Sequence, residues 1–410
     1  MDGLTSDGER KIAWAATWMP VLSLVRDRLR EEGSVSGRRI AVILPVEPKT
    51  AYLAAILAEA GAEVAVAFQG AMVHDDVAAG LAARGVAVFA RRGSSPEEEL
   101  RFFEEVLARR PEVVIDDRAD VIRLAHTTHP EVLETLVGAS EETTSGVVAL
   151  RAMEADGTLK VPCIAANDAR CKYLFDNRYG SGQSTVAAVM DSTNLVVAGK
   201  RLVVVGYGWV GKGIARRARG LNARVVVCEV DPFAALEAFH DGFEVLPVAE
   251  ACSSADIVMT ATGVRGSLPP EAIDRLRDGA LLANAGGIDD EFDVAALRAR
   301  ALSLSEARPG VEEIRLAEDR SVFVVGGGVV VNLSAGEGHP VEIMDLTFAV
   351  QALAARYLLE HGRELEPRVH PFPPELDEQV ARWKLEALGV RIDALTEAQR
   401  AFLGGWEAFA

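Results

Sequence analysis

Apolar residues recur every three or four positions between residues 8 and 31, which indicates an amphipathic helix, and Pro20 predicts a break within it. Four short runs rich in β-branched residues follow, separated by helical segments such as 49–60 and 96–109. These runs are residues 38–44, 62–68, 86–90 and 112–117. Strands that alternate with helices in this way are typical of a parallel sheet.

A second alternating series begins at residue 200. It predicts strands at 200–208, 223–231, 256–262, 280–286 and 322–332. A chain of 410 residues is too long for one ordinary core. We therefore predict an α/β protein with two doubly wound, Rossmann-like parallel-sheet domains and a cleft between them. Residues 1–180 and 335–370 are assigned to the first domain, 181–334 to the second, and 371–410 to a small helical C-terminal appendage.

Composition narrows the possible partners. The chain is 49% hydrophobic and 25% charged, as in ordinary soluble globular proteins. The net charge of −18 and the scattering of the 43 basic residues argue against nucleic acid or an anionic membrane as a partner. No run approaches the roughly 20 apolar residues that a membrane span needs.

The four cysteines, Cys163, Cys171, Cys228 and Cys252, form no CxxC pair and no cluster with zinc spacing. We expect reduced thiols in a cytoplasm, Cys171 as a small buried hydrophobe, and no metal site. The acidic N-terminus has no long apolar core, so we expect no signal peptide.

A glycine-rich motif marks the second domain. Gly206, Gly208 and Gly211 have GxGxxG spacing and lie between an apolar strand and a helical segment. Such a loop brings the backbone close to a pyrophosphate at a helix N-terminus. The next strand ends at Glu229, a suitable acceptor for the adenosine ribose hydroxyls, which favours NAD over NADP. Residues 181–334 are therefore predicted to bind NAD, and a nicotinamide implies hydride chemistry.

The segment "NDARCKYLFDN" (167–177) places Lys172 and Asp176 one helical turn apart, with Asn167 and Asn177 beside them. On a helix, the two side chains would share a face. Taken alone, such a pair is usually a surface ion pair of little energetic weight. Only its neighbourhood can give it a function.

Five motifs in order carry a resemblance to the adenosylhomocysteinase family: "SEETTSG" (140–146), "NDARCKYLFDNRYG" (167–180), "GYGWVGKG" (206–213), "EVDP" (229–232) and "VNLSAGEGHP" (331–340). The resemblance extends from about Met19 to Leu403. It implies an enzyme that holds NAD tightly and oxidises the ribose 3′-hydroxyl of S-adenosylhomocysteine. It then removes the 4′-proton, expels homocysteine, adds water at C5′ and reduces the ketone.

By this resemblance, Lys172 takes the 3′-hydroxyl proton and Asp176 orients the lysine, and we expect desolvation to lower the pKa of Lys172 enough for it to act as a base. Asn167 and Asp117 complete the predicted catalytic set. Predicted substrate-binding residues are Glu142, His339 at the adenine edge, Met344, Glu47 and Lys49. Besides the glycine loop and Glu229, the predicted cofactor contacts are Thr143, Thr144, Asn177, Asn284 and Asn332.

The chain also departs from the family. "LPVEPKTA" has Pro45, Glu47 and Lys49 where the family has a histidine, a threonine and a glutamate. Residues 65–76 replace a polar segment that helps to line the family's substrate site, and Gly287 replaces a second histidine. The family's C-terminal lysine and tyrosine, which reach into a neighbouring subunit's NAD site, are absent. We expect looser NAD binding and a homo-oligomer, either a dimer or a tetramer.

The residues that bind adenine, oxidise the ribose and bind NAD are therefore kept. The residues that serve departure of the sulfur leaving group and addition of water have changed. This division favours a diverged dehydratase or lyase that makes a 4′,5′-unsaturated adenine nucleoside in secondary metabolism, such as nucleoside antibiotic biosynthesis. The alternative is S-adenosyl-L-homocysteine hydrolysis, with His74 or Asp75 as possible sources of the missing proton transfer. A non-catalytic NAD-binding regulator is a second alternative, against which Lys172 and Asp176 argue. A 2-hydroxyacid dehydrogenase is disfavoured because no Arg/Glu/His set is visible.

Overall fold

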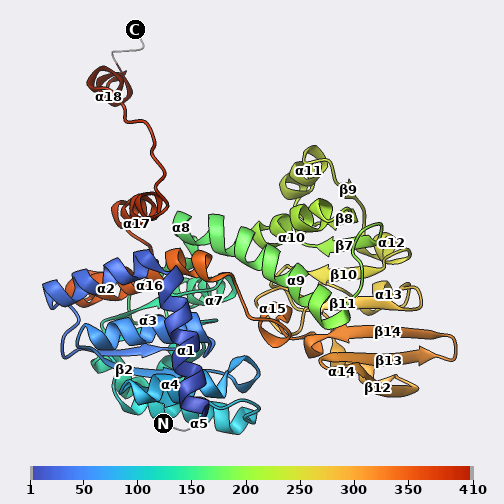
Figure 1. Ribbon diagram of the computed structural model, residues 1–410, viewed down its shortest axis with the longest axis horizontal. Coiled ribbons are helices and arrows are strands. Elements are labelled where there is room, and N and C mark those ends of the chain that lie inside the picture. Colours follow the sequence, from blue (N-terminus) through green and yellow to red (C-terminus); the bar gives the residue numbers. More distant parts are fainter. Residues whose placement is uncertain (1–2, 407–410) are drawn as a thin grey trace.

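A computed structural model describes residues 3–406, which form two α/β domains side by side with long helices between them (Figure 1). The first sheet has seven parallel strands in the order β15-β6-β5-β4-β1-β2-β3. Its strands are β1 (Arg39–Val42), β2 (Glu63–Ala67), β3 (Ala87–Phe89), β4 (Val113–Asp116), β5 (Gly138–Glu141), β6 (Cys163–Ala165) and β15 (Val369–Pro371).

Helices cover this sheet. They are α1 (Gly3–Trp18), α2 (Pro20–Glu32), α3 (Pro48–Glu59), α4 (Asp75–Ala83), α5 (Pro96–Ala108), α6 (Asp120–Thr127), α7 (Thr144–Ala155), α8 (Arg170–Lys172), α16 (Val341–His361) and α17 (Pro374–Ala387), with short 3₁₀ turns η1 (Gly70–Met72), η2 (Pro130–Glu134), η3 (Ala166–Asp168) and η6 (Gly362–Glu364). Asp345 on α16 accepts hydrogen bonds from the backbone N–H groups of Val21 and Leu22 at the start of α2. The same carboxylate accepts one from Lys384 on α17, so a buried side chain ties three helices together.

The second sheet has eight strands in the order β12-β13-β14-β11-β10-β7-β8-β9. They are β7 (Arg201–Val205), β8 (Arg224–Cys228), β9 (Glu244–Val245), β10 (Ile257–Thr260), β11 (Ala280–Asn284), β12 (Ser303–Arg308), β13 (Val311–Ala317) and β14 (Arg320–Val325). Its helices are α9 (Ser181–Thr193), α10 (Trp209–Gly220), α11 (Pro232–His240), α12 (Val248–Cys252), α13 (Pro270–Ile273), α14 (Val294–Ala299), η5 (Gly326–Gly328) and α15 (Val331–Ser334). A last helix, α18 (Glu397–Gly404), lies away from both domains (Figure 1).

Both sheets reverse their strand order beside their first strand, between β1 and β4 and between β7 and β10. This is the doubly wound arrangement, in which ligands bind at the carboxyl ends of the strands where the order switches. The first strands end immediately before "LPVEPK" and before the glycine-rich loop. The fold therefore places both sequence motifs at ligand-binding positions.

The predicted fold class is confirmed, and most predicted strands overlap the observed ones, with ends that differ by a few residues. The predicted strand at 322–332 is too long, because β14 ends at Val325 and η5 and the start of α15 follow it. The second sheet has an antiparallel edge that was not predicted, because β13 pairs antiparallel with both β12 and β14. The turn at Gly310, with φ of +74°, is the local signal for this hairpin. Strands β5, β6 and β15 of the first sheet were not predicted, nor were β9, β12 and β13 of the second.

The four cysteines are all unpaired and buried; reduced thiols were expected for all four, and burial for Cys171. Residues 407–410 of the predicted C-terminal appendage lie outside the described residues. Within residues 3–406, no helix is long and apolar enough to cross a membrane.

Candidate active site

A cavity of about 120 Å³ lies at the point where the first sheet reverses its strand order. Its walls come from the carboxyl ends of β1, β4 and β5, from the segment before α16, and from α16 itself. The lining residues are Leu44, Pro45, Glu47, Lys49, Thr50, Asp117, Glu142, Thr143, Lys172, Asp176, Leu333, Gly338, His339, Met344 and Phe348. Most residues predicted for catalysis and substrate binding thus meet in one place.

Lys172 ends the short helix α8, and a π-helix, η4 (Tyr173–Gly180), follows it directly. The prediction of an ordinary helical turn between Lys172 and Asp176 is therefore wrong in its local geometry. In a π-helix, residues five apart share a face, so Asn177 reaches Lys172 as well as Asp176 does. Short stretches of π-helix within α-helices are frequent at functional sites.

Four side-chain oxygens surround the ammonium nitrogen of Lys172. Nζ lies 2.8 Å from Asn177 Oδ1, 3.2 Å from Asp176 Oδ1, 3.4 Å from Asn167 Oδ1 and 3.5 Å from Glu142 Oε1. The lysine side chain is only 6% exposed, which makes these contacts far stronger than those of a surface ion pair. The pair is therefore not the surface feature that its sequence spacing alone would suggest.

The expected lowering of the Lys172 pKa is wrong for this arrangement. Burial alone would lower the pKa of Lys172, but the carboxylates of Asp176 and Glu142 outweigh it, and the pKa is raised. Burial likewise would raise the pKa of Asp176, but His339 and Lys172 hold it below its ordinary value. In this state of the protein, Lys172 is an ammonium group beside an ionised aspartate.

Two more carboxyl groups line the cavity. Burial raises the pKa of Glu142 to about 8, against the opposing attraction of Lys172. Gln351 on α16 donates a hydrogen bond of 2.6 Å to Glu142 Oε2, which fixes its orientation. Burial also raises the pKa of Asp117, whose Oδ1 has no hydrogen-bond partner. A buried carboxyl group with a raised pKa is a suitable acid or base near neutral pH.

His339 lies against Asp176 as well as beside the cavity. Its Nδ1 is 3.3 Å from Asp176 Oδ2, and its Nε2 is 3.0 Å from Ser181 Oγ. Thr347 on α16 donates to the same carboxylate oxygen at 3.1 Å. The predicted contact of His339 with the adenine of the substrate stays a prediction.

Glu47, Lys49, Thr50 and Met344 form another part of the cavity wall. Glu47 Oε1 accepts from the backbone N–H and the hydroxyl of Thr50, and Oε2 accepts from Lys49 through its backbone N–H and its ammonium. Lys49 also donates to the Glu337 carbonyl at 2.8 Å, so one of its three N–H donors remains available. Met344 is a buried apolar part of the same wall.

The glycine-rich loop has the shape that a dinucleotide needs. Gly206 has φ of +98°, and a Cβ at Gly211 would lie only 2.0 Å from the Gly206 carbonyl oxygen. A Cβ at Gly208 would meet no atom within 4 Å, which leaves space for phosphate at the start of α10. Glu229, at the end of β8, accepts hydrogen bonds from the backbone N–H groups of Tyr207, Val230 and Asp231. It therefore holds the glycine loop and retains capacity for a ribose hydroxyl.

Replacement of Glu229 by alanine is expected to weaken NAD binding by about ten- to hundredfold, because it removes charge-assisted hydrogen bonds to the ribose and to the loop. Titration of the purified protein with NAD, beside its thermal unfolding curve, measures the effect. Glu229→Gln keeps an acceptor for the Tyr207 N–H and should lose less. Equal affinity of the unchanged protein for NAD and NADP would contradict this role.

The other predicted cofactor residues lie around the cleft. Thr143 caps the N-terminus of α7, where its hydroxyl accepts from the Gly146 N–H, and Thr144 donates to Asn167 at 3.3 Å. Asn284 is fully buried, and its amide donates to the carbonyls of Ile288 and Gly328. It therefore positions the two segments that contain these residues. Asn332 donates to Ser184, and its Oδ1 is buried without a partner. Contacts of these side chains with a cofactor stay predictions.

The two positions at which the family has imidazoles lie on different domains. Pro45 lines the cavity, and the Gly287 carbonyl lies 3.4 Å from Ser145 Oγ in the first domain. His74 and Asp75 line a separate hollow of about 550 Å³ instead of the cavity.

Three residues that orient the site were not predicted from the sequence. Ser181 contacts His339, Thr347 donates to Asp176, and Gln351 donates to Glu142. Their positions within helices carry no local signal of this role. Within residues 3–406, no group of His, Cys, Asp or Glu side chains could hold a metal ion.

Comparison with known proteins gives consistent matches. Residues 177–338 match the family "S-adenosyl-L-homocysteine hydrolase, NAD binding domain", and residues 3–131 match "S-adenosyl-L-homocysteine hydrolase". The adenosylhomocysteinase of Thermotoga maritima is 49% identical over 401 residues, covering 98% of this chain and 99% of that protein. The adenosylhomocysteinase of Pyrococcus abyssi is 49% identical over 405 residues, with coverage of 98% and 96%. The S-inosyl-L-homocysteine hydrolase of Methanopyrus kandleri is 46% identical over 406 residues, again covering 98% and 96%.

Proposed function

The chain belongs to the S-adenosyl-L-homocysteine hydrolase family, and from this premise we propose that it hydrolyses S-adenosyl-L-homocysteine to adenosine and L-homocysteine. It is an enzyme with NAD as its cofactor, as its sequence predicted. One observation carries the proposal. The buried cluster of Lys172, Asp176 and Glu142 lies where the first sheet reverses its strand order, and the glycine loop lies where the second sheet does so.

When bound, NAD supplies the hydride acceptor for oxidation of the ribose 3′-carbon. Lys172 takes the proton of the 3′-hydroxyl, for which it must first be neutral. A further positive charge near this pocket, such as that of an oxidised nicotinamide ring, would lower the pKa of Lys172 by like-charge repulsion. Asp176 then orients the amine, and the buried carboxyl of Asp117, with its free Oδ1, is suited to removing the acidified 4′-proton.

Dehydration of a 5′-hydroxyl is the second candidate. One observation favours it: Pro45 and Gly287 provide no acid or base where the family has imidazoles. However, the relatives that cover nearly the whole chain are named for hydrolysis of a homocysteine thioether. They give no support to the preference for a dehydratase in secondary metabolism.

The product tests the proposal. The NAD-loaded enzyme should release free thiol from S-adenosyl-L-homocysteine, which a thiol-specific reagent detects. Enzyme that reduces its NAD with adenosine but releases no thiol would favour the second candidate.

We also infer a homo-oligomer. Helix α18 has no buried residue, and the arm that carries it projects from the body (Figure 1). Leu403 and Trp406 are 65% and 81% exposed there. Apolar side chains in such an arm are suited to packing on a second copy of the chain.

A further inference from the structure

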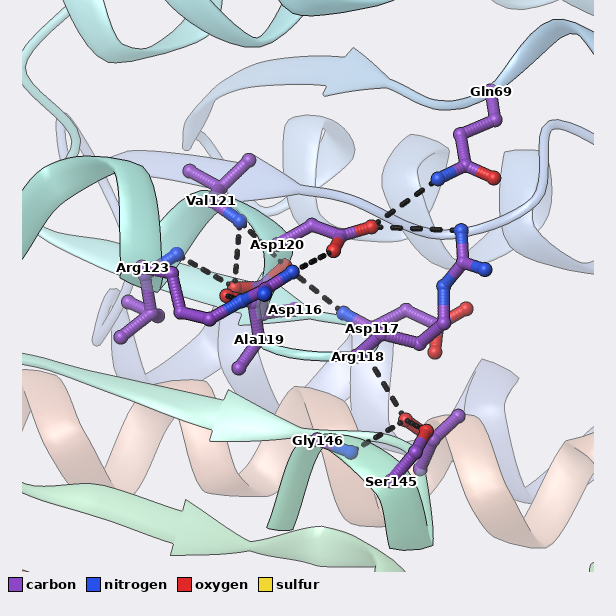
Figure 2. A network of polar contacts seen from close by, with 12 residues as sticks. Gln69, Asp116, Asp117, Arg118, Ala119, Asp120, Val121, Arg123, Ser145 and Gly146 are labelled. Atoms are coloured by element: carbon purple, nitrogen blue, oxygen red, sulfur yellow. Dashed lines mark hydrogen bonds and ion pairs between the residues drawn. The ribbon is translucent and has the colours of Figure 1, made fainter. Parts of the chain in front are cut away.

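Charged side chains line one part of the cavity in the first domain. Lys172 lies within 3.5 Å of Asp176 and Glu142, and the charge of Asp117 also acts on it. Asp117 begins the turn between β4 and α6, and Figure 2 shows the polar contacts of this turn around Arg118. In the proposed reaction these groups serve the ribose, so they leave the rest of the cavity for the base of the nucleoside.

Apolar side chains and one ammonium group line another part of the cavity. The apolar lining residues are Leu44, Leu333, Met344 and Phe348. Walls of this kind are suited to a flat heteroaromatic base. A Cβ at Gly338 would lie 3.0 Å from Leu333 Cδ2 and 3.6 Å from Lys49 Nζ, so the glycine keeps the space between them open. A base on the apolar walls can therefore present an edge to Lys49.

Glu47 and Lys49 lie at the start of α3, and the hydrogen bonds of Glu47 are all made within the protein. Its Oε1 accepts from the N–H and the hydroxyl of Thr50, and its Oε2 accepts from the N–H and the ammonium of Lys49. A carboxylate has about four acceptor positions, so those of Glu47 are occupied. Lys49 uses two of its three ammonium donors, on Glu47 at 2.6 Å and on the Glu337 carbonyl at 2.8 Å. Together, Glu47 and Lys49 offer a base one charged donor and no acceptor.

Lys49 reverses the hydrogen-bond polarity of its position, because the family has a glutamate there. An ionised glutamate only accepts hydrogen bonds, and a lysine ammonium only donates them. At position 6, adenine carries an amino group, which donates, whereas a 6-oxopurine carries a carbonyl oxygen, which accepts.

Adenine can also accept from Lys49, through its ring nitrogen N1. Its 6-amino group would then lie beside an ammonium, and neither Glu47 nor Lys49 could accept from it. A donor that loses water without gaining a partner weakens binding. The charged donor of Lys49 therefore favours a carbonyl oxygen at this edge of the base.

We propose that Lys49 selects a 6-oxopurine by donating its third N–H to the carbonyl oxygen at C6, so that the enzyme prefers a hypoxanthine nucleoside to an adenine nucleoside. This proposal rests on the proposed function, because it specifies the base of the thioether that is hydrolysed and leaves the reaction at the ribose unchanged. S-adenosyl-L-homocysteine remains a substrate and binds more weakly than its hypoxanthine counterpart.

Calorimetric titration of the NAD-loaded full chain with 3′-deoxyinosine and with 3′-deoxyadenosine tests this preference. Neither ligand has the 3′-hydroxyl that is oxidised, so binding is measured without reaction. Wild type should bind 3′-deoxyinosine about ten- to hundredfold more tightly, as expected for a hydrogen bond from a charged donor. In Lys49→Met, affinity for 3′-deoxyinosine should fall by about this factor, and the preference should be lost. Lys49→Arg keeps a charged donor beside Glu47 and should retain part of it.

Lys11→Met is the matched control. Lys11 also pairs with a carboxylate, Asp76 at 2.7 Å, but it lines the separate hollow, so both affinities should be unchanged. Equal affinity of the wild type for the two ligands, or tighter binding of 3′-deoxyadenosine, would overturn the preference whether or not Lys49→Met folds. A preference that survives in Lys49→Met, or an equal loss of both affinities there, would overturn the role of Lys49. Because these ligands cannot react, a failure of thiol release would count against the proposed hydrolysis and not against the base preference.

Discussion

Replacement of Lys172 by methionine is expected to slow reduction of bound NAD by adenosine by about 10²- to 10⁴-fold, the usual contribution of a general base. Lys172 lies within 3.5 Å of four side-chain oxygens and is the amine at the centre of the cluster. Because a base acts in the transition state, adenosine should still bind. Rapid mixing that follows the absorbance of reduced nicotinamide measures the rate, and calorimetry measures binding.

Lys172→Arg separates the loss of the base from the loss of charge. Arginine keeps a cation beside Asp176 and Glu142, so the fold is retained, but it does not give up its proton in proteins. The rate should fall as far as in the methionine variant. Lys160→Met, at an exposed lysine that precedes β6 and whose ammonium donates to the Gly157 carbonyl, is the control and should reduce NAD normally. An unchanged rate in Lys172→Arg would make the lysine structural.

Asp176→Asn is expected to lower both activity and stability. The carboxylate is 2% exposed and faces Lys172, His339 and Thr347, so its neutral isostere leaves a buried ammonium with weaker partners. Breaking a buried ion pair typically costs about 3–5 kcal/mol in the free energy of unfolding. Denaturant unfolding of the variant beside Asp191→Asn, an exposed aspartate on α9, measures this cost.

The contribution of Asp176 to the free energy of unfolding should fall as the pH is lowered. Its pKa in the folded protein is held below its ordinary value, so its stabilisation is complete above the unfolded pKa of about 3.9. The stabilisation is then lost as the pH falls further, toward the folded pKa. The difference in unfolding free energy between wild type and Asp176→Asn should shrink on acidification below about pH 4. A difference that stays constant, or is absent at neutral pH, would contradict the buried charge.

The sequence predicts those parts of the site that are local. The GxGxxG spacing and the acidic end of β8 fix their own geometry, because a tight turn and a strand end need few distant contacts. The strand series likewise predicts both doubly wound sheets. The short strands β5 and β6 escape this reasoning, although their carboxyl ends carry Glu142 and lead to Asn167.

The electrostatics of Lys172 could not be predicted from its own segment. Glu142 approaches it from another strand, and the π-helix brings Asn177 to it, so the surrounding oxygens depend on tertiary structure. Asp176 was expected beside the lysine, but the added charge of Glu142 and the balance in which the two carboxylates outweigh burial depend on the fold, so the predicted direction of the Lys172 pKa was wrong. The left-handed turn of Arg118 and Ala119 has no sequence signal either, because neither residue is a glycine.

The identity of the leaving group tests the central claim most directly. Wild-type enzyme loaded with NAD is incubated separately with S-adenosyl-L-homocysteine and with adenosine, and free thiol is measured beside the product masses. The account predicts thiol released in step with adenosine formed from the first substrate, and no accumulation of a dehydrated nucleoside as the main product from the second. Loss of water from adenosine without thiol release from S-adenosyl-L-homocysteine would contradict hydrolysis and establish a dehydratase.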